Sequence, residues 1–234
     1  MEILSKVSWS GPALKLISYV HELNPSSSVF MIIRHSAREE SEDIQKILNA
    51  PLTKQGKKAA FEFGQSLPSH FTYHFHHSII ERCKETALCI EKGVRYNGGN
   101  TRYQGNLETL THIKGNSEKI IEFIGRDQEN FIRYWMQNQY PPELIEPPLN
   151  LAKRTASELM KIFQNNHSPS TIHVFVTHDI HILIYLFYWA KIEKFEEWVQ
   201  YLEGFILQLK ENKLEVYHER GKKELNYPEW WTFS

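Results

Sequence analysis

The chain has 234 residues, of which 41% are hydrophobic and 24% charged, values that suit a medium-sized globular protein and exclude disordered and fibrous classes. Its 27 basic and 28 acidic residues leave a net charge of −1, so the basic excess of general nucleic-acid binders and anionic-membrane binders is absent. Two cysteines, Cys83 and Cys89, are too few for a disulfide framework or a four-cysteine zinc site and favour a reducing compartment.

The apolar pattern predicts helices alternating with strands. Helical spacing indicates helices, while short continuous runs such as VFMII and IHVFVT are typical of strands buried on both faces. The predicted helices are 11–23, 54–66, 81–92, 117–139, 151–165 and 180–190, and the predicted strands are 29–33, 71–77 and 172–177. Residues 24–28 form a predicted turn, Thr53 a predicted N-cap, and Pro68 and Gly93 are expected to end the second and third helices.

This alternation implies right-handed crossovers and a mostly parallel sheet. The stretch 98–148 breaks the rhythm, because its predicted helix is followed by two Pro-Pro pairs, and we interpret it as a helical insert or cap. Residues 204–217 alternate apolar and polar side chains around Glu211 and Asn212, which predicts a hairpin. The predicted fold is one α/β domain over 1–234, a three-layer α/β/α sandwich with a central, mostly parallel sheet and the helical insert.

No targeting or membrane segment is expected. The N-terminal residues lack the apolar core and small-residue cleavage site of a secretory signal. The most apolar run, IHILIYLFYWA at 180–190, is much shorter than the roughly 20 residues that span a bilayer, so a buried helix is predicted there. We therefore expect a cytoplasmic protein with no membrane partner and no nucleic-acid partner.

Two arginines flank a histidine where the first predicted strand ends. Functional residues of open parallel sheets gather beyond the carboxyl ends of strands, and RHSAR at 34–38 follows the strand 29–33 directly. The guanidinium groups of Arg34 and Arg38 match the oxygens of a tetrahedral phosphate dianion. His35, held against such an anion, can attack phosphorus through a ring nitrogen. Taken alone, this pentapeptide fits an ordinary polar turn equally well.

Two further groups of polar residues occupy similar positions. His178 and Asp179 follow the strand 172–177, and Asp179 can serve as a general acid, as the N-cap of the next helix, or as both. Arg82 lies at the start of the helix 81–92, where it adds a third guanidinium beside the positive end of the helix dipole.

Together these motifs resemble the histidine phosphatase superfamily, which includes phosphoglycerate-mutase-like and acid-phosphatase-like proteins. The resemblance rests on four segments in the expected order, RHSAR at 34–38, LTxxGxxxA at 52–60, SxxxRCxxTA at 78–87 and THD at 177–179. It spans about 29–181, and the hairpin at 204–217 resembles the late strands of that family. Only 98–148 and the tail at 229–231 lie outside it.

The resemblance implies that His35 is the nucleophile and becomes phosphohistidine, which water then hydrolyses. The phosphate would be bound by four side chains, Arg34, Arg38, Arg82 and His178. No metal and no cofactor are implied, since cationic side chains supply the charge that magnesium supplies elsewhere. The substrate is expected to be a phosphomonoester of a small molecule or a protein, and the oligomeric state stays open.

Two positions depart from the family pattern. Ser36 replaces the usual glycine and is expected to narrow the site, to be neutral, or to donate a hydrogen bond to the phosphate. The proton donor is Asp179 if the chain follows the acid-phosphatase-like branch, and Glu108 if it follows the mutase-like branch, which 52–60 resembles. We favour Asp179, because its adjacency to His178 fixes it near the phosphate. An aspartate acid predicts a mildly acidic pH optimum.

Other notable side chains are better explained by packing. The histidines of HFHH at 74–77 have no neighbouring carboxylate or cysteine cluster, so exposed or half-buried strand histidines are expected rather than metal ligands. Cys83 is expected to be a small core residue. The aromatic residues Phe131, Tyr134 and Trp135 are expected to pack, or to contact the substrate if the insert covers the site.

The predicted function is metal-independent hydrolysis of phosphomonoesters through a phosphohistidine at His35. One alternative is a phosphoglycerate-mutase-type phosphotransferase with the same intermediate, which requires a loop closure that the motifs do not show. A second alternative is a catalytically silent phosphate-binding or regulatory protein, and the complete set of motif residues argues against it.

Overall fold

Seven strands form one mixed sheet in the order β3-β2-β4-β1-β5-β6-β7. The structure is a computed structural model that describes residues 2–24, 29–165, 169–194 and 197–231, so most of the predicted turn at 24–28 lies outside the described residues. The strands are β1 (Val29–Arg34), β2 (Thr72–His77), β3 (Asn100–Asn106), β4 (Thr171–Thr177), β5 (Gly204–Leu209), β6 (Lys213–His218) and β7 (Gly221–Asn226). Strands β3, β2, β4 and β1 pair in parallel, and β1, β5, β6 and β7 pair antiparallel.

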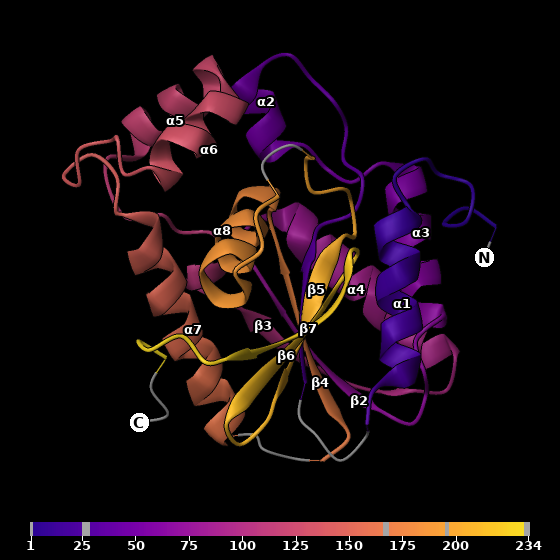
Figure 1. The fold of residues 1–234 in the computed structure, drawn as a ribbon. Helices are drawn as coiled ribbons and strands as arrows, with labels where there is room; N and C mark the ends of the chain where they lie inside the picture. The colour runs from indigo at the N-terminus through magenta and orange to yellow at the C-terminus, as the bar shows by residue number, and fades with distance from the viewer. Residues whose placement is uncertain (1, 25–28, 166–168, 195–196, 232–234) are drawn as a thin grey trace.

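Helices cover both faces of this sheet. They are α1 (Gly11–Glu22), α2 (Ile44–Asn49), α3 (Lys54–Gln65), α4 (Glu81–Tyr96), α5 (Ser117–Arg126), α6 (Gln128–Met136), α7 (Pro148–Asn165) and α8 (Asp179–Ala190), with a short 3-10 helix η1 (Glu108–Leu110). Helices α1, α3 and α4 lie on one face and α7 and α8 on the other, while α2, α5 and α6 stand beyond one end of the strands (Figure 1). The predicted three-layer α/β/α sandwich with parallel central strands is confirmed.

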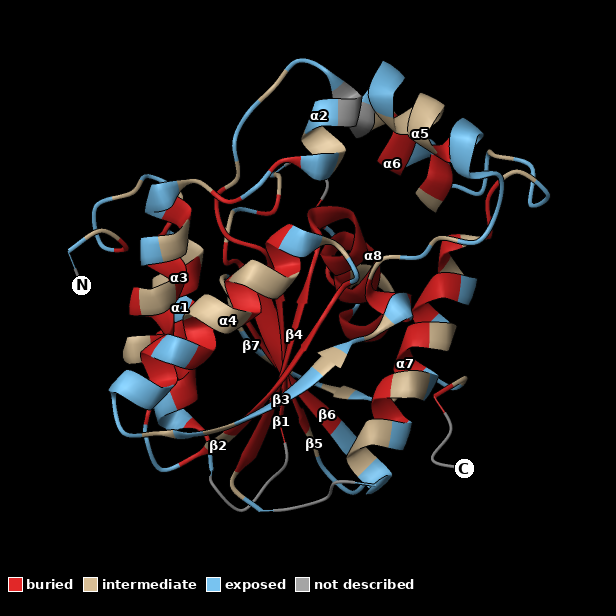
Figure 2. Ribbon diagram, turned by 180° about the vertical axis from the view of Figure 1, so that it is seen from behind, coloured by how far each residue is buried: buried red, intermediate tan, exposed pale blue. Residues whose placement is uncertain are grey.

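The two helical layers explain why β1 is a continuous apolar run. Its side chains alternate in direction, so Val29, Met31 and Ile33 pack with α1, α3 and α4, whereas Phe30 and Ile32 pack with α7 and α8. The buried strands lie between the two layers (Figure 2), and each layer therefore encloses its own apolar core. Helix α8 contains the apolar run at 180–190. It is apolar on nearly all sides and buried, which confirms the predicted buried helix. In the part of the chain that is described, no helix is long and apolar enough to cross a bilayer.

Helix α4 corrects the prediction that Gly93 ends it. The helix continues to Tyr96, and Gly93 serves the packing of α4 on α3 instead. A Cβ atom at Gly93 would lie 2.0 Å from the carbonyl oxygen of Phe61, and one at Gly64 of α3 would lie 2.0 Å from that of Ile90. The two backbones thus approach so closely that neither glycine has room for a side chain.

The predicted insert at 98–148 also needs correction. Its first part is β3, a polar and mostly exposed strand that pairs with β2 at the edge of the sheet, so it lacks the apolar pattern that reveals buried strands. The single helix predicted over 117–139 is two helices, because Asp127 has an extended conformation (φ −166°) and caps α6 by accepting a hydrogen bond from Asn130 N. Strand β7, which is equally polar, was not predicted.

Candidate active site

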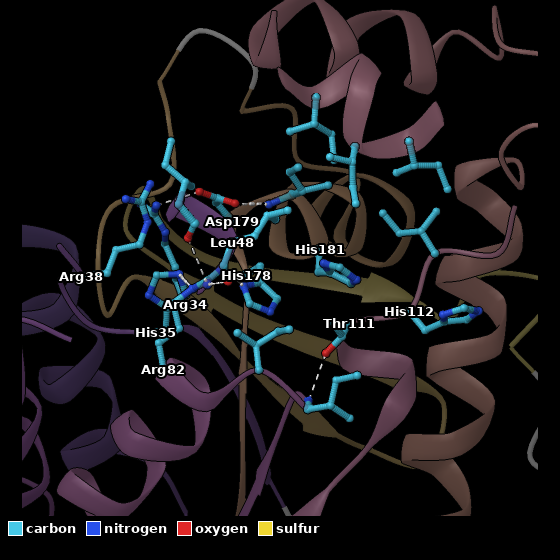
Figure 3. Close-up of a pocket in the computed structure, with 18 of the residues that line it drawn as sticks. Arg34, His35, Arg38, Leu48, Arg82, Thr111, His112, His178, Asp179 and His181 are labelled. Carbon is cyan, nitrogen blue, oxygen red and sulfur yellow. Dashed lines mark hydrogen bonds and ion pairs between the residues drawn. The ribbon is translucent and has the colours of Figure 1, made fainter. Parts of the chain in front are cut away.

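A pocket of about 340 Å³ opens beyond the carboxyl ends of the parallel strands. All six side chains singled out in the sequence line it, namely Arg34, His35, Arg38, Arg82, His178 and Asp179. In Figure 3 the labelled arginines converge with His35, His178 and Asp179 at one end of the pocket. Their convergence follows from the register, because β1 and β4 are neighbours with Arg34 opposite Thr177. His35 and His178 therefore leave the sheet side by side.

The backbone around His35 is fixed from two directions. His35 N donates to the carbonyl of Thr177 on β4 at 3.0 Å, and Arg34 N donates to the carbonyl of Glu203, just before β5, at 2.8 Å. On the side of α3, Thr53 caps the helix by accepting from Gly56 N at 2.8 Å, and its own N–H donates to the carbonyl of Ala37. The LTxxG motif thus holds the loop that follows β1.

Ser36 belongs to this framework, which corrects the suggestion that it donates to the phosphate. Its side chain is fully buried, and its hydroxyl donates to the carbonyl of Gly56 at 2.7 Å. Its N–H donates to the hydroxyl of Thr86, which in turn donates to the carbonyl of Arg82. A Cβ atom at Gly56 would lie 2.1 Å from the carbonyl oxygen of Ala37. Glycine is therefore needed at position 56, while position 36 accommodates serine.

His35 presents the lone pair of a neutral imidazole to the pocket. Its Nδ1 lies 2.8 Å from the carbonyl oxygen of Ser36, so Nδ1 carries the proton, and its Nε2 accepts a hydrogen bond from Arg82 Nε at 3.0 Å. Burial, followed by the charges of Arg34 and Arg82, lowers the pKa of His35 well below 6.5. The ring is therefore unprotonated at neutral pH, which a nucleophilic nitrogen requires.

Arg82 connects the two histidines with α2. Besides its bond to His35, it donates to the carbonyl of Leu48 at 2.6 Å, and its other terminal nitrogen lies 3.3 Å from Nδ1 of His178. Nε2 of His178 lies 3.0 Å from the hydroxyl of Ser78. Burial and the charge of Arg82 lower the pKa of His178 well below 6.5. The Ser and Arg of the SxxxR motif thus both contact the second histidine.

Arg34 and Asp179 form a buried ion pair. Arg34 Nη2 lies 2.7 Å from Asp179 Oδ2, and both side chains are about nine-tenths buried. The same carboxylate accepts hydrogen bonds from the indole N–H of Trp198 and from Ile180 N, each at 2.9 Å. Burial by itself would raise the pKa of Asp179, but Arg34 and the two donors outweigh it and lower that pKa. Asp179 is therefore ionised in the resting pocket.

The segment before β5 completes the surroundings of Arg34. Arg34 Nη1 donates to the carbonyl of Val199 at 2.6 Å, and the guanidinium carbon lies 4.3 Å from the ring centroid of Tyr201. Within the described part of the chain Arg34 Nε has no hydrogen-bond partner. Trp198 and Tyr201 were missed in the sequence, where they are aromatic residues in a loop without a motif.

Arg38 lies at the solvent side of the pocket. An isolated β-bridge between Arg38 and Leu52 links the RHSAR segment to the LTxxG segment. Its Nη1 donates to the carbonyl of Glu39 and to the carboxylate of Glu40, the latter at 3.0 Å. The Glu40 carboxylate also accepts from the hydroxyl of Tyr201, and its side chain is 71% exposed. An incoming anion therefore has to displace a solvated carboxylate from Arg38. The free-energy cost is small, because exposed ion pairs contribute little.

Several residues weighed in the sequence do not reach the pocket. Glu108, the alternative proton donor, is exposed at the start of η1 and is not part of the lining. Phe131 and Trp135 are buried in the core beside α7 and α8, and Tyr134 is 43% exposed on α6. None of these three aromatic residues lines the pocket, so the expected packing is confirmed for Phe131 and Trp135, and the alternative of a substrate contact gains no support.

The three histidines of β2 are buried rather than exposed or half-buried, and His74 and His76 pack against His173 of β4. His76 and His173 lie side by side with ring nitrogens 3.4 Å apart, and His74 meets His173 edge to face. Burial lowers the pKa of His76 to about 3 and that of His173 to about 4. In the described ranges, no three His, Cys, Asp or Glu side chains are grouped as metal ligands. Cys83 is fully buried, and burial raises the pKa of its thiol to about 12, so it is a core residue.

Comparison with known proteins agrees with this geometry. The family model of the histidine phosphatase superfamily (branch 1) matches residues 30–203. The match covers most of the chain, and the protein belongs to this superfamily. No curated protein sequence matched the chain.

Three solved structures illustrate the likeness in fold. Bacillus stearothermophilus YhfR superposes with a TM-score of 0.56 at 16% identity, covering 79% of this chain and 93% of its own. A phosphoglycerate mutase from Bacillus anthracis str. Sterne gives 0.53 at 14% identity, covering 86% and 94%. A protein named mycobacterial hydrolase 1 gives 0.52 at 12% identity, covering 86% and 97%. At these identities the likeness concerns the fold alone.

Proposed function

We propose that the protein hydrolyses phosphomonoesters through a phosphohistidine at His35. The observation that carries the proposal is the neutral His35 ring, whose Nε2 lone pair lies among the guanidinium groups of Arg34, Arg38 and Arg82. A dianionic phosphate placed there meets fixed positive charge on several sides, and that charge also stabilises the transition state.

The reaction runs in two displacements. In the first, Nε2 of His35 attacks phosphorus, the bond from phosphorus to the ester oxygen breaks, and that oxygen receives a proton as the alcohol leaves. In the second, water attacks phosphorus and gives one proton back to the group that protonated the alcohol, and the P–N bond breaks, which releases inorganic phosphate and restores the neutral ring. The hydrogen bond from Arg82 Nε to His35 Nε2 must be exchanged for one to a phosphate oxygen before attack, so substrate binding itself exposes the nucleophile.

Asp179 is the proposed proton donor for the leaving alcohol. In the resting pocket Arg34 keeps it ionised. A bound phosphate dianion shares the charge of Arg34 and adds negative charge nearby, and both effects raise the pKa of Asp179. The carboxyl group then takes up a proton when substrate arrives. The exposed position of Glu108 supports Asp179 over that alternative.

Hydrolysis of an aryl phosphate in EDTA tests the proposal. The purified protein should release phosphate from p-nitrophenyl phosphate, and His35→Ala should abolish the release. His70→Ala is the matched control, because His70 is exposed and lies before β2, outside the pocket lining. Brief reaction followed by mass spectrometry should show phosphate on the peptide that contains His35. Turnover that survives His35→Ala would overturn the proposal, and binding of phosphate without turnover would favour a silent phosphate-binding protein.

A further inference from the structure

The pocket continues well beyond its charged end, and there its walls are apolar. Eight of the nineteen residues that line it are isoleucines. In Figure 3 the labelled residues continue from the arginines through His181 towards Thr111 and His112 at the other end of the pocket. A phosphate held on His35 therefore occupies one end only, and the organic part of its ester must extend along the apolar walls.

Helix α5 supplies one wall. Ser117, Ile120, Ile121 and Ile124 line the pocket, and their spacing of three and four residues places them on one face of the helix. Ile120 is buried, whereas Ile121 and Ile124 are partly exposed. The other side of the helix carries the ion pairs of Glu122. Helix α5 thus directs its apolar face at the cavity and its charged face elsewhere.

The facing wall comes from α2 and from the start of α4. Ile79 is 54% exposed although it is a large apolar residue, and its N–H is bonded to the hydroxyl of Thr111 at 3.1 Å. Leu48 of α2 lines the pocket with its side chain, while its carbonyl accepts the hydrogen bond from Arg82. The apolar wall and the phosphate end therefore share a helix and form one continuous site.

The lining offers few groups for a polar ligand. Among the described residues that line the pocket, Asp179 is the single carboxylate and is paired with Arg34, and none is a lysine. Away from the phosphate end the polar side chains are Thr111, His112, Ser117 and His181, and burial lowers the pKa of His181 to about 4, so it adds no charge. A sugar or nucleoside carries several hydroxyl groups, and those that face isoleucine rather than these four side chains would lack hydrogen bonds, which is unfavourable.

We propose that the substrates are phosphomonoesters with an apolar alkyl or aryl group, which lies between α5 and the wall formed by α2 and Ile79. This inference rests on the proposed function for the position of the phosphate. The apolar group covers isoleucine surface that is otherwise open to solvent, and the removal of that surface from water supplies the selectivity.

A series of n-alkyl phosphates tests the proposal by turnover. If the added carbons are buried, kcat/KM should rise about fourfold for each methylene, the factor that corresponds to about 0.8 kcal/mol, until the pocket is filled. Butyl phosphate should exceed glycerol 3-phosphate, which is similar in size but carries two hydroxyl groups. A flat series, or a preference for the glycerol ester, overturns the inference even while hydrolysis that depends on His35 supports the proposed function.

Variants of α5 locate the selectivity. Ile121→Asn and Ile124→Asn should each flatten the dependence on chain length, with the largest loss for the longest ester. Ile162→Asn is the matched control, because Ile162 is a partly buried isoleucine of α7 outside the lining, and it should keep the full dependence. Two separate variants are needed so that misfolding of one, checked by thermal melting, does not decide the result.

Binding measurements separate this inference from the proposed function. Alkylphosphonates cannot be hydrolysed, and calorimetry should give a Kd that falls with chain length in the unmodified protein, with a negative heat-capacity change. This dependence in a protein that hydrolyses none of the esters would support the apolar site and contradict the phosphatase activity. Phosphonate affinity that is independent of chain length overturns the apolar site whatever the activity.

Discussion

Arg82 donates a hydrogen bond from Nε to Nε2 of His35 across 3.0 Å, so its guanidinium group occupies the lone pair of the atom proposed to attack phosphorus. The contact fixes the tautomer, since an N–H at Nε2 would meet another donor. It also requires a neutral ring. The charges proposed to bind phosphate therefore also keep the proposed nucleophile, His35, unprotonated.

Replacement of Arg82 should damage the chemical step. Arg82→Ala is expected to lower kcat/KM on aryl phosphates by roughly 10²–10³, the usual effect of removing one donor from a charge-stabilising site. Arg82→Lys should recover part of the loss, because lysine keeps the charge without the forked geometry. Arg95→Ala, at the exposed end of the same helix, serves as control and should match the unmodified protein. An Arg82→Ala variant of near-normal activity would contradict the assigned role.

Substitution of Asp179 should depend on the leaving group. Asp179→Asn is expected to lower kcat on alkyl phosphates by roughly 10²–10⁴, the range for general acid catalysis. Its effect on p-nitrophenyl phosphate should be much smaller, because that alcohol leaves without a proton. Comparison of the two esters is the measurement. Equal losses on both would mean that Asp179 only positions Arg34.

Trp198 provides a separate test of the same carboxyl group. Its indole N–H stabilises the ionised form of Asp179, so Trp198→Phe should raise the pKa of that carboxyl. An acid that stays protonated to higher pH extends activity in that direction. The alkaline limb of the pH–rate profile on alkyl phosphates should therefore move upward, and an unchanged limb would argue against Asp179 as the acid.

Stability should decline in mild acid because of the histidines between β2 and β4. The pKa values of His76 and His173, about 3 and about 4, lie below those of the unfolded chain, so the unfolded state takes up protons first. Their contribution to the free energy of unfolding is fully present above a pH of about 6.5 and falls as the pH is lowered, down to about 4 for His173 and about 3 for His76. We expect a loss of about 2 kcal/mol per histidine between pH 7 and pH 5. Urea unfolding at both pH values measures it.

His173→Phe isolates one of these contributions. The ring contacts those of Phe30 and Phe175, so phenylalanine suits these aromatic surroundings and removes the titrating group. The variant should lose less stability on acidification than the unmodified protein. His70→Phe, at an exposed site, should leave the pH dependence unchanged. The same slope in both variants would assign the acid sensitivity to other groups.

Ser36→Gly should cost stability rather than catalysis. Removal of the hydroxyl breaks its bond to the carbonyl of Gly56 and should lower the free energy of unfolding by about 1 kcal/mol. Competitive inhibition by inorganic phosphate should be nearly unchanged, because the hydroxyl is already engaged. A marked weakening of phosphate inhibition in this variant would show instead that Ser36 reaches the ligand.

Buried parts of the molecule were predictable from the sequence, and exposed ones were not. The runs VFMII and IHVFVT predicted β1 and β4 because both faces of these strands are covered, whereas the parallel pairing of β1 with β4, which brings the polar residues after them together, came from the structure. Strands β3 and β7 were not predicted, because their positions at the edges of the sheet allow polar side chains. The end of α4 was wrongly predicted at Gly93, because close packing of two helices and the end of a helix both favour glycine.

In the functional site, residues that belong to a motif were predictable from the sequence, and those outside a motif were not. Arg34, His35, Arg82 and His178 were found because their motifs have fixed places at strand and helix ends. Trp198 was not found, since its hydrogen bond to Asp179 depends on how the loop before β5 returns over the sheet. The ion pair between Arg34 and Asp179 joins residues far apart in the sequence and required the structure.

The apolar wall of α5 belongs to none of the strands that hold His35 and His178. The helix stands beyond the end of the sheet (Figure 1), and its bounds fall in the one long excursion between β3 and α7. Exchange of isoleucines for smaller or larger side chains there would change which ester enters without shifting the attacking nitrogen. If the proposed function and substrate class hold, the reaction centre and the helix that sets ester selectivity are separate parts of the fold, and α5 can be redesigned for new phosphate esters without changing the catalytic residues.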